Sequence, residues 1–356
     1  MARVLAVSPS RGAAWFVALL VLACGIGLLP RSVAPRANAT FPGRNGDITF
    51  SILQEPCPDA AGARSFITTT TGAGGDFLGC DFDIFSVAAN GSGIRQLTPN
   101  PEHMDIQPAW SPDGRRIAFV RQDRPNANSD IFVMQSDGTG LTNLTPDLTV
   151  SDYTPAWSPD GDKIVFARRS PSGLIPIPEP AGAIDIYVMN ADGSDLVQLT
   201  DMPGSEGGAE WSPDGRWIVF GHCRETATPF GGGPLELIRS DGSGHRTLEV
   251  PGGNACVPHW SPDGKKILYT SVSGGDPRDI WEIRPDGSGA RNLTAGSEAD
   301  DLFGVWSPDG KRIAFLSDRD GAYKLYTMRV DGSEVRKLID LELNANEAAL
   351  DWGPRP

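Results

Sequence analysis

A five-residue string, Trp-Ser-Pro-Asp-Gly, occurs five times in this chain and constrains its fold more than any other feature. The copies begin at Trp110, Trp157, Trp211, Trp260 and Trp306, and a degraded sixth copy is Asp351-Trp352-Gly353-Pro354. Successive tryptophans are 47, 54, 49, 46 and 46 residues apart. Such a period indicates an array of similar supersecondary units, which pack against one another because a single unit cannot bury its apolar surface alone.

Each unit contains the sequence signals of four short strands. Ser-Pro-Asp-Gly forms a tight turn, because proline presets φ and glycine accepts the left-handed conformation. Strands rich in β-branched and aromatic residues follow, such as 116–119 and then 130–134. An Asp-Gly turn leads to a short fourth strand that ends in Leu-Thr. Four antiparallel strands in each repeat predict the blade of a β-propeller.

The two ends of the array predict how it closes. Gly46 to Phe50 matches a second strand, but no Trp-Ser-Pro-Asp-Gly precedes it. Leu350 to Trp352 matches a first strand, but no second strand follows it. The C-terminal strand is therefore expected to complete the N-terminal blade. We predict an all-β, six-bladed propeller of four-stranded antiparallel blades, built as a single domain over residues 40–356.

The repeat resembles that of the TolB-like β-propeller family over residues 45 to 354, through Trp-Ser-Pro-Asp-Gly followed by Ile-Ala-Phe and Asp-Ile-Tyr strands. The resemblance implies the fold and export. It does not imply one activity, because the family includes both protein-binding modules and propeller appendages of hydrolases. The fourth and sixth units depart from the pattern, with Pro234-Leu235-Glu236-Leu237 and Lys324-Leu325-Tyr326 in place of Asp-Ile-Tyr. The starts of these two strands are the least defined.

Residues 1–39 have the pattern of a secretory signal peptide. Arg3 and Arg11 precede an uncharged, mostly apolar run from Ala13 to Leu29, and Ala37-Asn38-Ala39 fits a cleavage site. An uncleaved membrane anchor is an alternative, because the run is just long enough to span a bilayer. A lipoprotein is a second alternative, because Val21 to Cys24 loosely resembles a lipobox. All three predict an extracytoplasmic location, whether secreted, periplasmic or attached to the cell envelope.

Beyond residue 39 the chain is strongly acidic, with 27 basic and 45 acidic residues and a net charge near −18. Such a surface repels phosphate backbones, so nucleic acid is not an expected partner. Anionic lipid is disfavoured for the same reason. We expect membrane contact only through an N-terminal anchor, and we expect a monomer.

Four cysteines follow the predicted signal peptide: Cys57, Cys80, Cys223 and Cys256. An even number in an exported chain favours disulfide bonds. Of the three formal pairings, Cys57–Cys80 and Cys223–Cys256 keep both bridges local. The first bridge would constrain the longest connection of the array.

The predicted topology separates two kinds of connection. The turns after first and third strands share one face and are all short, whereas the connections after second and fourth strands share the other face. The longest of these run from Ser51 to Phe82 in the first unit and from Ala167 to Ile184 in the third. Long excursions from a rigid scaffold often carry function, and insertion without a role is the alternative.

Acidic residues recur five positions before the tryptophans. They are Asp105, Asp152, Glu206, Asp301 and Glu347, with Ala255 in the fifth unit. At equivalent places in a ring they would encircle the mouth of the central channel. One hypothesis is that each carboxylate accepts backbone N–H donors where the chain bends into its first strand. The other is a negative funnel for a basic peptide or for a cation such as calcium, which prefers oxygen ligands.

The residue immediately before the tryptophan is also unusual in three units. Most units have alanine or valine there, but Glu210, His259 and Asp351 replace them. The simpler interpretation is solvated side chains beside a water-filled channel, and the alternative is a binding site.

Two classes of function remain after the motifs are considered. There is no Gly-x-Ser-x-Gly elbow, no zinc-type histidine spacing and no phosphate loop. The favoured function is an exported module that binds a protein or peptide through the long-connection face and needs no cofactor. The alternative is a hydrolase or lyase at the channel mouth, calcium-dependent or not, acting on a carbohydrate or ester.

Overall fold

The computed structural model describes residues 43–53, 82–123, 128–169, 184–202, 204–222, 233–271, 277–343 and 349–356. These residues form 24 β-strands and no helix. No membrane-spanning helix is therefore found among them. The predicted signal peptide lies outside the described residues.

The strands fall into six units of four, which we number one to six. Unit one has β24 (Leu350–Pro354), β1 (Asn45–Leu53), β2 (Phe82–Ala88) and β3 (Arg95–Gln96), and unit two has β4 (His103–Trp110), β5 (Arg116–Asp123), β6 (Ser129–Gln135) and β7 (Thr142–Asn143). Unit three has β8 (Ser151–Trp157), β9 (Lys163–Arg169), β10 (Ile184–Asn190) and β11 (Val197–Gln198), and unit four has β12 (Gly207–Trp211), β13 (Trp217–Gly221), β14 (Leu235–Arg239) and β15 (Arg246–Leu248). Unit five has β16 (Ala255–Trp260), β17 (Ile267–Ser271), β18 (Ile280–Ile283) and β19 (Arg291–Asn292), and unit six has β20 (Asp301–Trp306), β21 (Arg312–Ser317), β22 (Lys324–Arg329) and β23 (Arg336–Lys337).

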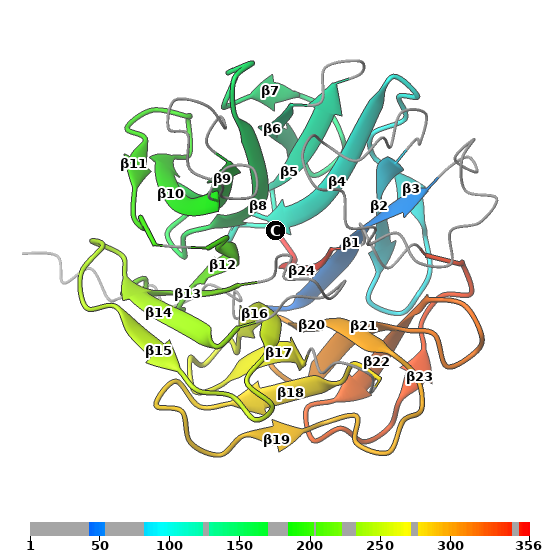
Figure 1. Cartoon of the computed structure of the whole chain (residues 1–356). Coiled ribbons are helices and arrows are strands. Elements are labelled where there is room, and N and C mark those ends of the chain that lie inside the picture. Colours follow the sequence, from blue (N-terminus) through cyan, green and yellow to red (C-terminus); the bar gives the residue numbers. More distant parts are fainter. Residues whose placement is uncertain are drawn as a thin grey trace, which may run out of the picture. The chain divides into compact units, whose positions relative to one another are not determined.

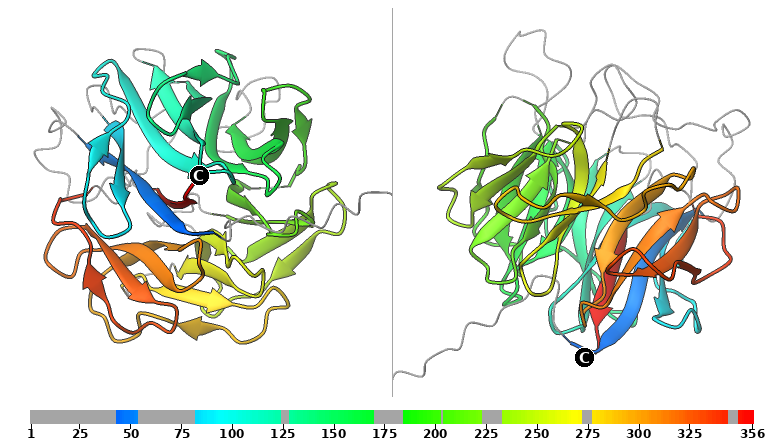
Figure 2. Two further views of the ribbon diagram at one scale, coloured as in Figure 1. Left: turned by 180° about the vertical axis from the view of Figure 1, so that it is seen from behind. Right: turned by 90° about the horizontal axis from the view of Figure 1, so that it is seen from below.

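Within every unit each strand pairs antiparallel with the next. Units three to six are separate four-stranded sheets, and one parallel pair, Phe82 with Met104, joins units one and two into a single sheet. Unit one takes its first strand from the C-terminus, since β24 pairs antiparallel with β1 with Trp352 opposite Ile48. Figure 1 shows the first strands innermost and the short fourth strands outermost, and Figure 2 shows β24 ending beside the start of β1.

The units pack against one another through six clusters of buried apolar side chains. Each cluster contains the repeat tryptophan of one unit and strand residues of the unit before it. One of them joins unit six to unit one, with Leu302 and Leu325 against Phe50 and Trp352. The six tryptophans are only 2–5% exposed. Burying a large aromatic side chain removes about 150–250 Å² from water, so these residues dominate the contacts between units.

The Ser-Pro-Asp-Gly turns all have one hydrogen-bond pattern. In unit two, Ser111 Oγ donates to Asp113 Oδ1 at 2.7 Å and accepts from Arg116 N at 2.9 Å. The serine–aspartate and serine–backbone bonds recur in the other four copies. Gly114 closes the turn with φ of 68°, a conformation that glycine adopts without a Cβ clash. The turn chemistry expected from the sequence is therefore present.

Gly353 of β24 has no room for a side chain. A Cβ there would lie 2.4–2.7 Å from ring atoms of Trp110, whereas a Cβ at Gly207 of β12 would meet nothing within 4 Å. We predict that Gly353→Ala lowers the free energy of unfolding by about 1–3 kcal/mol through overpacking. Gly207→Ala, the matched control, should change it by less than about 0.5 kcal/mol. Urea unfolding of both variants measures this, and equal effects would contradict the packing of β24 against unit two.

Candidate functional site

Five of the six first strands, all except β24, have an irregular step three residues before their tryptophan. Gln107, Thr154, Val257 and Phe303 have φ between 49° and 55°, and Gly208 has φ of 61°. The strand register shifts at the same places. A left-handed conformation costs a non-glycine residue about 1–3 kcal/mol and persists only where its surroundings hold it. These steps are therefore β-bulges imposed by the contacts between units.

Hydrogen bonds between successive units support the bulges. Thr154 N donates to Gln107 Oε1 at 2.8 Å, and Gly208 N donates to Thr154 Oγ1 at 3.3 Å. Phe303 N donates to Thr270 Oγ1 of unit five at 3.1 Å. The backbone of these first strands is thus held by side chains of the preceding unit.

The structure brings together the three predicted residues that precede a tryptophan. Glu210, His259 and Asp351, which we call the axial cluster, come from β12, β16 and β24. His259 Nε2 lies 3.7 Å from Glu210 Oε1 and 4.0 Å from Asp351 Oδ1. Both carboxyl groups also join units, since Trp260 N donates to Glu210 Oε2 at 2.9 Å and Trp110 N donates to Asp351 Oδ2 at 2.5 Å.

Burial controls the charge of the axial cluster. It raises the pKa of Glu210 well above its usual value and raises the pKa of Asp351 to about 7. It lowers the pKa of His259 to about 4, because burial penalises the charged form of each group. At neutral pH the axial cluster therefore carries less negative charge than two free carboxylates would. Its groups can donate hydrogen bonds as well as accept them.

Three of the acids five positions before a tryptophan lie in buried ion pairs. Asp105, Asp152 and Asp301 are fully buried. Arg121 and Arg168 each donate through Nε and Nη2, at 2.7 Å, to the two carboxylate oxygens of Asp105 and Asp152. Arg319 Nη2 donates to Asp301 Oδ1 at 2.8 Å. Their partners are guanidinium groups rather than the backbone N–H groups of one hypothesis, so both oxygens of Asp105 and of Asp152 are engaged, whereas Asp301 Oδ2 is buried without a hydrogen-bond partner among the described residues.

Each of these arginines also lies over two aromatic rings. The pairs are Phe119 with Phe132, Phe166 with Tyr187, and Phe315 with Tyr326, at 5.0–5.6 Å from the guanidinium carbon. Such stacking stabilises a cation in a low-dielectric site. Units two, three and six thus share an Asp–Arg–aromatic arrangement.

The sequence carried a signal for these pairs. In units two and three the arginine stands 16 residues after the acid and directly opposite it in the hairpin register. Counting positions only from the tryptophan does not reveal this acid–arginine pairing, because the arginine belongs to the next strand.

The remaining predicted acids differ from these three. Glu206, also buried, faces His222, with Nδ1 3.9 Å from Oε1. In unit five the equivalent position is Ala255, which pairs with Ser271. Glu347 lies outside the described residues. Within the described ranges, no group of three or more His, Cys, Asp or Glu side chains is arranged to hold a metal ion.

Of the predicted disulfide cysteines, only Cys256 lies among the described residues, on β16; Cys57, Cys80 and Cys223 lie outside them. The described neighbours of Cys223 and Cys256 lie close together. Gly233 pairs with Ala255, and a Cβ at Gly233 would lie 3.1 Å from Cβ of His222. The Cys223–Cys256 bond stays a prediction that this arrangement favours.

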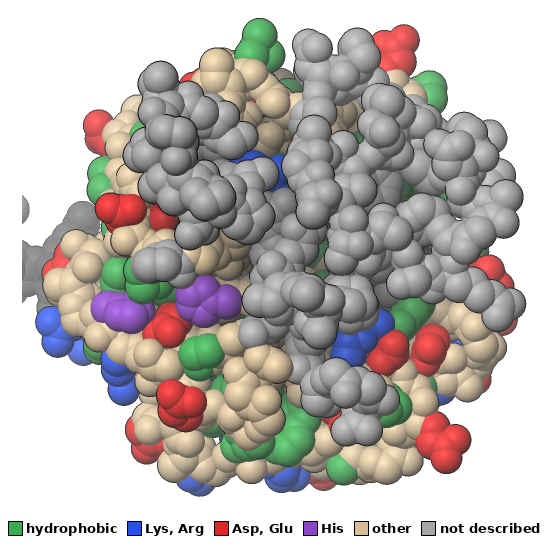
Figure 3. Space-filling view, viewed as in Figure 1, with side chains coloured by type: hydrophobic (Ala, Val, Ile, Leu, Met, Phe, Trp, Pro, Cys, Tyr) green, Lys and Arg blue, Asp and Glu red, His purple; other side chains and the backbone are tan. Residues whose placement is uncertain are grey.

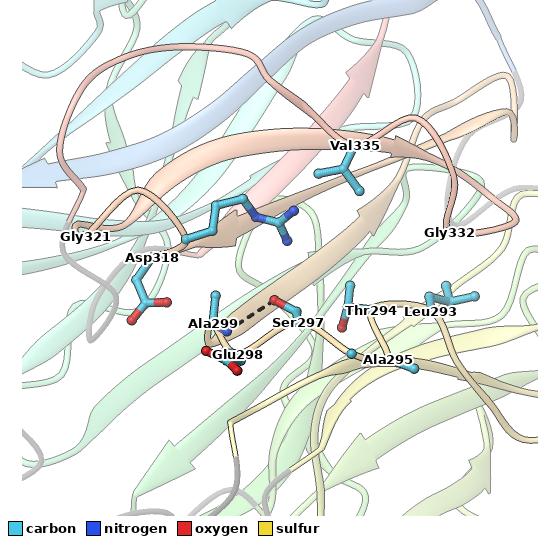
Figure 4. Close-up of a pocket in the computed structure, with 12 residues that line it drawn as sticks. Leu293, Thr294, Ala295, Ser297, Glu298, Ala299, Asp318, Gly321, Gly332 and Val335 are labelled. Atoms are coloured by element: carbon cyan, nitrogen blue, oxygen red, sulfur yellow. Dashed lines mark hydrogen bonds between the residues drawn. The ribbon is translucent and has the colours of Figure 1, made fainter.

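A pocket of about 650 Å³ lies between units five and six. Figure 4 shows Glu298 and Asp318 on one side and Val335 across from Ser297, whose Oγ accepts from Ala299 N at 3.2 Å. Asp318 Oδ1 accepts from Asp300 N at 2.9 Å. Arg319 also lines the pocket, so charges of both signs are present and no single ligand charge is selected.

Comparison with known proteins identifies the repeats. Residues 235–351 match the TolB beta propeller domain. A curated relative, the Protein TolB homolog of Chlorobium luteolum, is 31% identical over 263 residues, which are 73% of this chain and 55% of the relative. The repeats are those of the TolB-like β-propeller family. The chain spans about half the length of that relative.

Solved structures of TolB-like propellers share the fold. TolB from Acinetobacter baumannii has a TM-score of 0.65 at 18% identity, covering 87% of this chain and 67% of that one. The putative TolB from Agrobacterium tumefaciens has a TM-score of 0.58 at 20% identity, covering 88% of this chain and 100% of that one. At these identities the likeness concerns the fold alone.

The Asp105–Arg121 pair allows a direct test of its role. Arg121→Met should lower the free energy of unfolding by about 3–5 kcal/mol, because it leaves a buried carboxylate without its partner. The double variant Asp105→Leu/Arg121→Met should recover most of that loss. Arg216→Met, at a side chain 80% exposed, is the control and should have little effect. Denaturant unfolding measures all three, and a tolerated Arg121→Met would show that the carboxylate does not need the guanidinium.

Proposed function

We propose that this chain is an exported, six-bladed TolB-like propeller, closed by the pairing of β24 with β1, that binds a protein or peptide segment at or outside the cell envelope. The six clusters between consecutive units support the ring, because one of them joins unit six to unit one. The family resemblance supports a binding role, since the family includes protein-binding modules. The predicted signal peptide supports the location, and a monomer is the expected state.

One observation carries the proposed binding face. All the longer connections of the described strands follow a second or a fourth strand, at one end of the units. At the other end the strands join only through hydrogen-bonded Ser-Pro-Asp-Gly and Asp-Gly turns, such as those closed by Gly114 and Gly138. A rigid sheet array with unequal connections on one face is a suitable scaffold for recognition.

The charge of the chain indicates the kind of surface that a partner presents. The whole sequence has a formal net charge of −14. Figure 3 shows acidic side chains distributed over the viewed face, with histidines beside some of them near β13 and β14. A neutral or basic contact surface would associate faster than an acidic one.

Affinity capture tests this proposal. Residues 40–356, immobilised and exposed to solubilised native envelope, should retain a specific protein that mass spectrometry identifies. A variant lacking Glu55 to Phe77 should bind the purified partner at least about tenfold more weakly if that connection contributes about 1.4 kcal/mol or more.

The opposite face provides the control. Asp137→Ala alters an exposed turn whose carboxylate accepts from Thr139 N and Oγ1, and it should leave affinity unchanged in calorimetric titration. Equal affinity of the loop-deleted variant would remove that connection from the proposal. If only Asp137→Ala lost binding, the partner would bind the face with the short turns, and the proposed binding face would be wrong.

A further inference from the structure

Unit four departs from units two, three and six at the position of the buried ion pair. Four titratable side chains meet there, Glu206, His222, Glu236 and His245, which we call the unit-four cluster. His222 lies between the two carboxylates, with Nδ1 3.9 Å from Glu206 Oε1 and Nε2 3.7 Å from Glu236 Oε1. His245 Nε2 lies 3.0 Å from Glu236 Oε2.

The strand register shows which residues have been replaced. Phe220 pairs with Glu236, just as Phe119 pairs with Phe132 and Phe166 with Tyr187. Glu236 therefore stands where units two and three have their second aromatic ring. His222 follows Phe220 by two residues, as the arginines of units two and three follow their phenylalanines, so an imidazole stands where those units have a guanidinium.

The partners of these buried carboxyl groups differ from those in units two and three. Glu206 is 1% exposed and Glu236 is 6% exposed. Among the described residues their ion-pair partners are His222 and His245, and none is a lysine or arginine. These described partners are positively charged only when they carry a second ring proton, whereas an arginine stays charged at any pH that the fold meets.

The cluster extends across the boundary to unit three. Glu206 N donates to Ile184 O at 2.8 Å, and Thr200 Oγ1 donates to Glu206 Oε2 at 3.3 Å. Asp185 and Glu206 each directly follow one residue of the parallel bridge between Ile184 and Ser205, so the two acids are adjacent at this boundary. Both groups have a buried oxygen without a hydrogen-bond donor, Asp185 Oδ1 and Glu206 Oε1. One proton shared between the two carboxyl groups would satisfy both, and two ionised carboxylates would repel each other.

We propose that Glu206 and Asp185 share a proton that holds units three and four together at the long-connection end, and that losing this proton loosens this boundary. His222 and His245, when protonated, would act in the same direction by pairing with Glu206 and Glu236. Next to the boundary between units two and three, Asp152 has the permanently charged guanidinium of Arg168 as its partner instead.

The direction of the pH effect follows from the electrostatics. Burial and the nearby charge of Asp185 raise the pKa of Glu206 to about 8, and burial and Asp201 raise that of Asp185. An unfolded glutamate releases its proton near pH 4.3. The stabilisation is therefore complete below that pH and is lost as pH rises towards 8.

The consequence for recognition depends on the proposed binding function. β10 begins at Ile184, directly after the connection 170–183, and His222 directly precedes the connection 223–232. The described residues that flank these connections, Ile184 and His222, both contact Glu206 at this boundary, at the end of the units proposed as the binding face. Rising pH would therefore loosen the support of that face at one defined place.

The test follows the proton directly. In the intact mature chain with ¹³C-labelled glutamate, the Glu206 carboxyl carbon, assigned by its absence in Glu206→Gln, should titrate near pH 8. The thermal midpoint should fall between pH 6 and 8.5, and Glu206→Gln should remove most of that fall because its amide donates to Asp185 without ionising. Glu298→Gln, an exposed site, is the charge control and should behave like the unmodified chain.

A repeat-based exchange provides a second variant. His222→Arg supplies the guanidinium of units two and three and should stabilise the chain more at pH 8 than at pH 6. Titration of Glu206 below pH 5.5, or an unchanged pH dependence in Glu206→Gln, would overturn the proposal. These measurements need no partner, so the two proposals can fail separately. Failure to capture a partner would contradict the binding function but not the shared proton. A Glu206 that titrates below pH 5.5 would contradict the shared proton but not the binding function.

Discussion

A four-stranded sheet has two apolar faces and cannot cover either of them with its own strands. Every unit of this chain meets that constraint by packing on the next, and each of the six boundaries contains one repeat tryptophan. The period of the sequence is therefore the period of these contacts. Because each boundary depends on both of its units, the weakest one limits the whole array.

The first strands of the units, which lie innermost, are held by a second set of contacts between units. Bulges three residues before five of the six tryptophans turn the chain, and side chains of one unit hold the backbone of the next. In two places a carboxyl group before one tryptophan accepts the N–H of another, Glu210 from Trp260 and Asp351 from Trp110. Because these contacts hold the first strands in place, the units differ from one another in their connections and in replacements inside single units, as in unit four.

Much of the fold could be predicted from residues alone, because turn chemistry and strand patterns are local. The strand that begins at Leu350 was placed beside the N-terminal strand by the lack of partners at both ends, and it pairs there. The buried ion pairs were missed, because they join acids to arginines on the next strand. The meeting of Glu210, His259 and Asp351 could not be predicted, since three distant strands must converge before their side chains approach.

The C-terminal strand β24 pairs with β1 and contributes Trp352 to the cluster between units six and one. Removing Asp351 to Pro356 deletes Trp352 from its cluster and the carboxylate that accepts Trp110 N. Thermal unfolding followed by circular dichroism should show a clearly lower midpoint and a broader transition than for a chain lacking only Pro356. A truncated chain that unfolds at the same midpoint, with the same sharpness, would show that the units do not depend on this strand.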